Sequence, residues 1–217
     1  MGLSTQLNRL ANWLEQRSLL ARPWRRLRYV ALDVETTGLD ASTDTLLALA
    51  WVNIEPPLMD YGSAQYHVLA RAEQLDLKQS PIIHGLRQAD FTRSSEPRQT
   101  LKVLSRVLND AVLVCHNVQL DWQFLQQAAR KYDVTLKPAG FYDTLKAEHK
   151  RLQQKGETVQ RDMLTLATCR KRYGLPEYGN HHAFSDAIGC GELFLAQAYR
   201  YFGGANVRAR QVLRSSR

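Results

Sequence analysis

Cysteine is scarce and long apolar runs are missing from this 217-residue sequence. Cys115, Cys169 and Cys190 are odd in number and have no C-x-x-C spacing, so a disulfide framework is excluded and a cysteine-bound metal is unsupported. The longest apolar run, residues 46–52, is far shorter than the roughly 20 residues of a membrane-spanning helix. These absences predict a protein of the reducing cytoplasm without a membrane span.

Internal repeats and low-complexity tracts are also missing, and the length suits one domain with short end segments. The charge is uneven, because 29 Lys and Arg against 21 Asp and Glu give a formal net charge of +8. Residues 1–28 carry +5 and residues 203–217 carry +4, whereas residues 29–202 carry −1. A basic excess of this kind indicates a polyanionic partner such as nucleic acid or a membrane surface. We therefore expect the two ends to hold a phosphate backbone.

The two ends are expected to lie outside the main domain, which spans residues 28–202. Four leucines at helical spacing predict an amphipathic helix that is followed by a basic linker up to residue 27: Leu3, Leu7, Leu10 and Leu14. This helix could dock on its own domain, on a protein partner or on a second copy of the chain. An Arg-rich organelle presequence is the alternative. Residues 203–217 are expected to form a frayed basic tail.

Hydrophobic periodicity predicts an α/β domain. Three strands come first and then helices and strands alternate, which indicates a mixed sheet covered by helices on both faces. Strands are expected at residues 29–32, 46–54, 64–69, 111–115 and 141–142, with a hairpin turn over residues 56–62. Helices are expected at residues 96–108, 120–132, 163–173 and 182–201.

Two acids follow the first strand. Asp33 and Glu35 stand in the sequence Asp-Val-Glu-Thr-Thr-Gly-Leu, and strand residues two apart face the same side of a sheet. Two adjacent carboxylates repel one another unless a cation joins them, and hard oxygen ligands suit Mg²⁺ or Mn²⁺. A strand that ends in two solvated acids is the alternative interpretation.

Two more acids lie at the starts of later helices. Asp121 falls in the first turn of the helix after the fourth strand, and Asp186 falls in the first turn of the last helix. An acid is electrostatically favoured in a first turn, so helix stabilisation is the alternative for Asp121. His181 lies five residues before Asp186, in a loop where an imidazole can approach and leave a bound substrate. An ordinary surface histidine is the alternative.

Together these segments resemble the motifs of the DEDDh 3′-to-5′ exonucleases, the DnaQ-like family that includes the proofreading epsilon subunit of bacterial DNA polymerase III, ribonuclease T and oligoribonuclease. Residues 33–39 resemble the first motif, residues 116–121 (His-Asn-x-x-x-Asp) the second, and residues 181–186 (His-x-Ala-x-x-Asp) the third. The resemblance covers about residues 28–202, which it identifies as an exonuclease domain. It implies an α/β, ribonuclease-H-like fold with a mixed five-stranded sheet and helices on both faces.

The resemblance also implies a catalytic set: Asp33, Glu35, Asp121, Asp186 and His181. The four carboxylates would bind two Mg²⁺ ions, with Mn²⁺ as a substitute. The implied reaction is in-line hydrolysis of a phosphodiester from a free 3′ hydroxyl, with release of nucleoside 5′-monophosphates. His181 would act as the general base. The adjacent His182 is its rival, but the family spacing of five residues to Asp186 selects His181 and leaves His182 structural.

Substrate contacts near the 3′-terminal nucleotide are carried over in the same way: Thr36, Thr37, Leu39, His84 and Phe124. Leu39 is expected as an apolar wedge beside the base and Phe124 as a base-facing surface, whereas a structural role for His84 fits equally well. Asp143 is expected to cap a helix and not to bind metal. Trp122 could stack on a base or shield the pocket.

Three functions stay open. DNA is the favoured substrate, bound as a single strand with a free 3′ end. RNA is the first alternative, because discrimination at the 2′ hydroxyl depends on the shape of the pocket. A non-catalytic nucleic-acid-binding module of a polymerase or repair complex is the second. All five catalytic positions are present, which argues against this last function.

Overall fold

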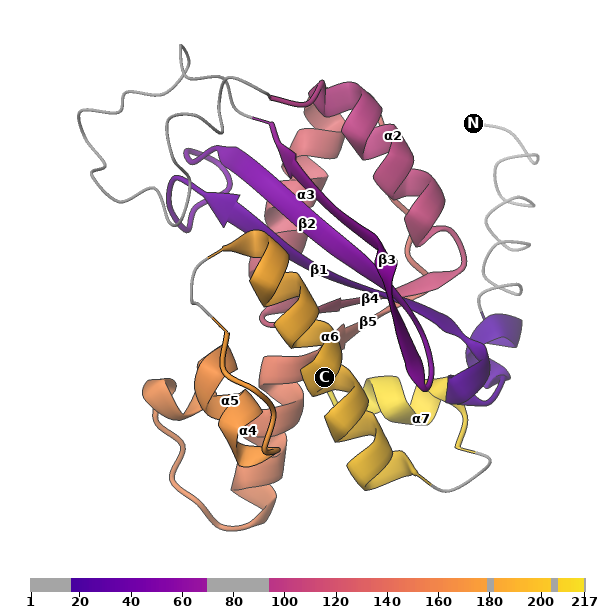
Figure 1. Ribbon diagram of the computed structural model, residues 1–217, viewed down its shortest axis with the longest axis vertical. Coiled ribbons are helices and arrows are strands. Elements are labelled where there is room, and N and C mark those ends of the chain that lie inside the picture. Colours follow the sequence, from indigo (N-terminus) through magenta and orange to yellow (C-terminus); the bar gives the residue numbers. More distant parts are fainter. Residues whose placement is uncertain (1–16, 70–93, 179–181, 204–206, 217) are drawn as a thin grey trace, which may run out of the picture.

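The computed structural model describes residues 17–69, 94–178, 182–203 and 207–216. In this part of the chain, five strands form one sheet in the order β3-β2-β1-β4-β5 (Figure 1). The strands are β1 (Arg28–Thr36), β2 (Leu46–Glu55), β3 (Leu58–Val68), β4 (Ala111–Cys115) and β5 (Gly140–Asp143). The first three pair antiparallel, whereas β1, β4 and β5 pair parallel. The predicted mixed five-stranded sheet is therefore confirmed.

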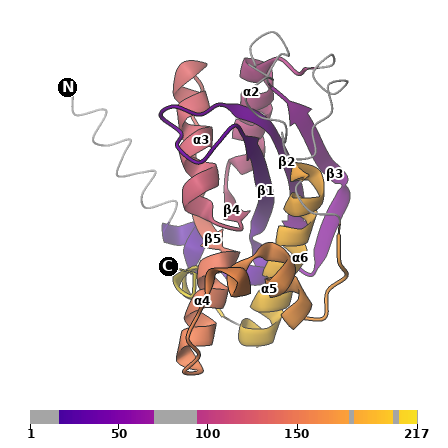
Figure 2. The ribbon, with the colours of Figure 1, turned by 90° about the vertical axis from the view of Figure 1, so that its left-hand side faces the viewer.

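Helices cover both faces of this sheet, as expected (Figures 1 and 2). The helices are η1 (Trp24–Arg26), α2 (Pro97–Leu108), α3 (Val118–Lys131), α4 (Thr144–Gln154), η4 (Arg161–Leu164), α5 (Leu166–Arg172), α6 (Ala183–Phe202) and α7 (Ala209–Arg214), and residues 17–21 are also helical. Side chains alternate along β1. Tyr29 and Ala31 pack in the apolar cluster of α6 and α7, while Val30 and Leu32 pack in that of α2 and α3.

Helix α6 lies close against β1 and β2 because its sheet-facing side is small. A Cβ atom on Gly191 would come within 3.1 Å of the Cβ of Ala31 and of the Cδ1 of Ile54. Such contacts are tighter than a packed interior tolerates without a shift of the helix. The expectation that small residues allow this helix to approach the sheet is confirmed at Gly191, and the approach brings the first turn of α6 to the carboxyl end of β1.

Both ends of the described chain belong to the same core. The backbone N–H of Trp24 donates to the carbonyl of Val207 at 2.9 Å. Trp24 is 1% exposed and Leu213 of α7 is 2% exposed, and both lie in the cluster that includes Tyr29 and Ala31. The expectation of a frayed C-terminal tail is wrong, because α7 buries an apolar face. The bounds expected for the main domain, residues 28 and 202, separate segments that pack in this one core.

Two other expectations need correction. The hairpin turn is shorter than residues 56–62, because β3 already begins at Leu58 and includes Asp60 and Gly62. The helix expected at residues 163–173 is divided at Thr165, whose extended backbone and side chain cap a new helix through the N–H of Thr168 at 3.2 Å. The leucine stripe of residues 3–14 lies outside the described residues. Within the described ranges, no helix is long and apolar enough to cross a membrane.

Candidate active site

Three elements bring four carboxyl groups to one end of the sheet. Asp33 and Glu35 continue the alternation of Tyr29 and Ala31 along β1, so they face the side that α6 covers. Asp186 lies in the first turn of α6 and Asp121 lies in the first turn of α3. The sequence predicted this convergence. The charges of Glu35, Asp121 and Asp186 all act on Asp33, which shows that the four groups lie close together.

Asp33 interacts with all three of the others. Burial raises its pKa well above the ordinary value, and the charges of Asp121, Asp186 and Glu35 raise it further, in that order. A carboxylate surrounded by three others is unfavourable in a site of low polarity unless protons or cations neutralise the group. The pocket therefore favours positive charge.

Glu35 is 8% exposed and has one oxygen without a partner. Burial raises its pKa to about 7, Asp186 adds to the rise, and a hydrogen bond from the backbone N–H of Ala183 opposes it. That hydrogen bond joins the end of β1 to the first residue of α6. The unpartnered Oε1 is a buried acceptor, and such atoms in native proteins normally have a hydrogen-bond donor or a cation beside them.

Asp121 is 4% exposed. Burial raises its pKa to about 7 and the charge of Asp143 adds to this, whereas its own N–H, the thiol of Cys115 and the N–H of Val34 favour the ionised form. These opposing influences leave Asp121 close to its ionised form near neutral pH, in which it can serve as a ligand.

The start of α3 is held by an acid from a neighbouring strand. Asn117 precedes the helix in the left-handed conformation, with φ of 101° and no side-chain cap. Oδ2 of Asp143 accepts from the N–H of Val118 at 3.1 Å. Oδ1 of Asp143 accepts from Leu145 and Lys146, each at 3.1 Å. The predicted capping role of Asp143 is confirmed and extends to a second helix.

The start of α6 is capped by His182. Its Nδ1 accepts from the N–H of Phe184 at 3.3 Å, and its ring lies 4.8 Å from the ring of Tyr66. These contacts agree with the structural role expected of His182. His181, the predicted general base, lies outside the described residues.

The donor set fits a divalent cation. Four carboxylates are hard oxygen ligands with a combined charge of −4 when ionised, and one of them has a buried oxygen without a hydrogen-bond partner. Burial and then the charges of the other three acids raise the pKa of Asp33. Among the residues that the structure describes, no three His, Cys, Asp or Glu side chains are placed as a finished ligand cage.

Four of the five predicted substrate contacts fall into three groups. Leu39 is 78% exposed and projects from the loop after β1, as a wedge requires. Thr36 donates to the carbonyl of Gly38 at 2.6 Å, and the hydroxyl of Thr37 accepts from the N–H of Thr45 at 2.9 Å, so both hydroxyls shape that loop. His84 lies outside the described part of the chain.

Phe124 does not have its expected placement. Its side chain is 0% exposed and packs in the cluster of α2, α3 and the sheet, so the expectation of a base-facing surface is wrong. Phe124 lies one turn after Asp121 on the same face of α3, and at that turn this face packs against the core. Trp122 is half-buried, with its ring 5.0 Å from that of Phe141 in an edge-to-face arrangement. This contact accounts for Trp122 without a bound base.

Sequence reasoning missed two residues that support the site. His116 is half-buried, and in its neutral form its Nε2 donates to the carbonyl of Leu164 at 2.8 Å while its Nδ1 accepts from the hydroxyl of Thr144 at 2.7 Å. Burial lowers the pKa of this imidazole, which favours that neutral pattern. The position of His116 in the second motif was a signal, but only the fold reveals its partners on α4 and η4.

Arg170 is the other missed residue, and it is 4% exposed. Its guanidinium donates to the carbonyls of Gly189 and Pro176, each at 2.7 Å, and forms an ion pair with Glu192 at 2.8 Å. Its carbon centre lies 4.4 Å from the ring centre of Tyr178. Arg170 thereby fixes to α6 the segment that leads towards residues 179–181. The pattern of a seven-residue helix does not distinguish a buried arginine from an exposed one.

Comparison with known proteins gives matches that agree with this geometry. Residues 30–194 match the family described as Exonuclease (RNase_T). The chain is 29% identical over 204 residues to ribonuclease T of Hahella chejuensis, with 85% of this chain and 89% of that protein covered. It is 26% identical over 168 residues to the PolC-type DNA polymerase III of Thermotoga maritima, with 77% of this chain and 12% of the polymerase covered.

Among solved structures, one match is Escherichia coli exonuclease I, crystallised with single-stranded DNA and zinc. The TM-score is 0.65 at 12% identity, and the match covers 81% of this chain and 41% of the other. The fold is therefore ribonuclease-H-like, as predicted. The chain spans only about an eighth of the PolC-type polymerase and less than half of exonuclease I.

Proposed function

The chain belongs to the RNase_T exonuclease family, a family of divalent-metal-dependent 3′-to-5′ exonucleases, and from this premise we propose that it hydrolyses DNA from a free 3′ end and releases nucleoside 5′-monophosphates. The observation that carries the proposal is the convergence of four carboxyl groups from β1, α3 and α6. A purely structural role does not account for four mutually repelling acids at one end of a sheet.

Asp33, Glu35, Asp121 and Asp186 would hold two Mg²⁺ ions, with Mn²⁺ as a substitute. Two such ions, when bound, activate the attacking water and stabilise the leaving 3′ oxygen. The protein contributes the positions of the ligands. The N–H of Ala183 favours the ionised form of Glu35, and the Cys115 thiol and the Val34 N–H favour that of Asp121.

His181 is proposed as the general base that takes the proton of the attacking water, because an imidazole titrates near neutral pH. His182 holds the first turn of α6 and thereby the position of Asp186. Thr36, Thr37 and Leu39 are proposed to contact the terminal nucleotide, with Leu39 beside its base. His84 remains proposed as a neighbour of that nucleotide.

RNA is the second candidate substrate. It is favoured by the ribonuclease T match, which covers 89% of that relative, whereas the PolC-type polymerase is matched over 12% of its length. DNA is favoured by the exonuclease I structure, which was crystallised with single-stranded DNA. The N-terminal helix expected from the leucines of residues 3–14 is proposed to bind a partner protein or a second copy of the chain, and deletion of residues 1–22 should then abolish that association.

The test uses 5′-labelled DNA and RNA strands of the same base sequence, each with a 3′ hydroxyl or a 3′ phosphate. The purified chain is incubated with Mg²⁺, Mn²⁺ or chelator. Faster stepwise shortening of the DNA with a 3′ hydroxyl supports the proposal. Faster shortening of the RNA supports RNA as the substrate instead. No cleavage of any strand refutes both the DNA and the RNA proposals.

A further inference from the structure

Two adjoining cavities lie on the side of the molecule formed by α4, α6 and α7. The larger has a volume of about 400 Å³ and is lined by Lys150, Arg151 and Arg214 together with the rings of Tyr173 and Tyr201. The Nζ of Lys150 donates to the carbonyl of Arg214 at 3.3 Å, which joins α4 to α7. Among the described residues, no acidic side chain lines this cavity.

The smaller cavity has a volume of about 230 Å³ and shares Arg151, Tyr173 and Tyr201 with the larger one. It adds Lys155, Arg172 and Arg200 to the lining, along with one acid, Glu157. The carbon centre of the Arg200 guanidinium lies 5.8 Å from the ring centre of Tyr173. The two cavities therefore form one surface, called the basic cleft here, in which six cationic side chains surround two tyrosines.

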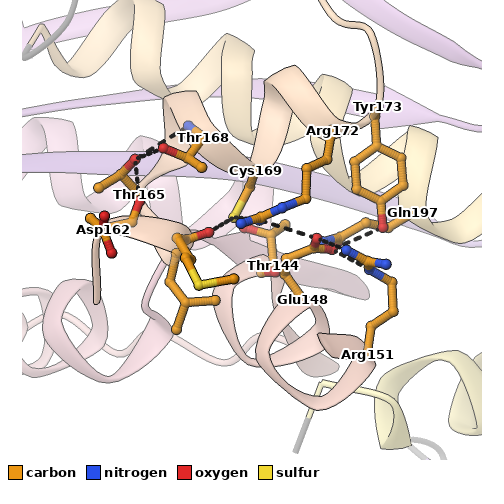
Figure 3. A network of polar contacts seen from close by, with 12 residues as sticks. Thr144, Glu148, Arg151, Asp162, Thr165, Thr168, Cys169, Arg172, Tyr173 and Gln197 are labelled. Carbon is orange, nitrogen blue, oxygen red and sulfur yellow. Dashed lines mark hydrogen bonds and ion pairs between the residues drawn. The ribbon is translucent and has the colours of Figure 1, made fainter. Parts of the chain in front are cut away.

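A buried glutamate, Glu148, bonds three of the side chains that line the basic cleft, Arg151, Arg172 and Tyr173 (Figure 3). Glu148 is 0% exposed, and both of its oxygens accept from Arg151, one of them from Nε at 3.1 Å. Glu148 also accepts from Arg172 at 3.4 Å and from the hydroxyl of Tyr173 at 2.9 Å. Arg151 donates to Glu148 through Nε and Nη2, so its Nη1 takes no part in this ion pair. A fixed guanidinium of this kind is well suited to bind phosphate.

We propose that the basic cleft binds the substrate strand several nucleotides upstream of the 3′ end that occupies the carboxylate site. This inference rests on the proposed nuclease function and adds to it a second site. Cationic side chains interleaved with aromatic rings are the common composition of surfaces that bind single strands, because cations contact the phosphates and rings stack on the bases.

The charge of the basic cleft selects a strand over a free mononucleotide. Six basic side chains stand against two acids, Glu148 and Glu157, which leaves a net charge of +4. A single terminal phosphate carries at most about two negative charges. A strand presents one charge for each successive phosphate and matches cations that are spread over two cavities.

The distance between the two sites sets the length of strand that reaches both. Asp186 and Tyr201 lie in the first and last turns of the same helix, fifteen residues apart, which is about 22 Å along its axis. At about 3.4 Å for each stacked nucleotide, this separation corresponds to roughly six nucleotides. A trinucleotide should therefore contact the carboxylate site alone.

The test is a binding measurement in chelator, where no turnover is needed. The triple variant Lys150→Gln, Lys155→Gln, Arg214→Gln removes three exposed charges and leaves Glu148 with its partners. Its matched control, Lys102→Gln, Arg106→Gln, Arg130→Gln, removes three exposed charges from α2 and α3. Fluorescence anisotropy with a labelled strand of about 15 nucleotides should show roughly tenfold weaker binding by the cleft variant, and a log–log salt slope smaller by about 2.

The control variant should bind this strand as the unmodified protein does, and a labelled trinucleotide should not distinguish the three proteins. Equal losses in the cleft and control variants, or unchanged binding by the cleft variant, would overturn the inference. So would displacement of the long strand from the cleft by a nucleoside monophosphate at a matched phosphate concentration. If cleavage persists while the cleft variant binds normally, the upstream site fails and the proposed nuclease function stands. If cleft binding holds but no substrate is cleaved, the nuclease function fails instead.

Discussion

Replacing Glu35 with Gln tests whether burial and the nearby charge of Asp186 make an ionised Glu35 unfavourable in the metal-free protein. Glu35 is buried, and its pKa is raised to about 7 from the ordinary 4.5. Between these two values, the folded state holds a proton that the unfolded chain has lost. The stability of the metal-free protein should therefore fall as the pH rises through this window.

The magnitude follows from the same two values. At about 1.4 kcal/mol for each pH unit, the ionised Glu35 costs the fold up to about 3 kcal/mol at pH values above 7. Glutamine has the same shape without the charge. Glu35→Gln should therefore raise the free energy of unfolding by about this amount near pH 8 and should change it little near pH 5.

The assay is urea unfolding in chelator at about pH 5 and about pH 8, with Glu55→Gln as the matched control because Glu55 is exposed at the end of β2. Added Mg²⁺ or Mn²⁺ should stabilise the unmodified protein more at the higher pH, since protons compete for the same oxygens. A Glu35→Gln effect that is the same at both pH values would refute the reasoning, because it would then arise from packing and not from charge.

Three further predictions concern the two histidines before α6, the ion pair of Arg170 and the packing of α7. His182→Ala should lower stability by about 1 kcal/mol through loss of the α6 cap while most turnover remains, whereas His181→Ala should abolish most turnover at unchanged stability; the reverse pattern in steady-state kinetics contradicts the assignment. Arg170→Ala should cost about 3 kcal/mol in urea unfolding, because it leaves Glu192 without its cation; a loss below about 1 kcal/mol would show that the ion pair is dispensable. Leu213→Ala should lower the free energy of unfolding by about 3 kcal/mol because α7 belongs to the core. An unchanged unfolding midpoint would instead support a frayed C-terminal tail.

The sequence was sufficient for the sheet and for the carboxylate set because both depend on local patterns. Period-two alternation along β1 places Asp33 and Glu35 together, and strand β4 delivers the chain to the start of α3 and Asp121. The family and the fold that the motifs implied are confirmed. A single motif would have been weak evidence for the family, whereas three motifs in the expected order rarely occur together by chance.

The remaining features depend on contacts between distant segments. No local pattern shows that Leu213 packs with Trp24, so a basic tail was expected where a buried helix is found. Phe124 could equally face a substrate or the core, and only the packing of α3 on the sheet decides for the core. The basic cleft unites residues from α4, α6 and α7 that are up to 64 positions apart. Net charge located the basic excess at the ends and did not show that Arg214 joins charges from the middle of the chain.

The most direct test of the central claim is a cleavage time course on a 5′-labelled single strand with Mg²⁺, for the unmodified chain and for Asp186→Ala. The account predicts a ladder that shortens one nucleotide at a time from the 3′ end, with nucleoside 5′-monophosphates as the other product. It also predicts that chelator or Asp186→Ala stops this shortening. Internal cuts, shortening from the 5′ end, or a ladder that persists in Asp186→Ala would contradict it.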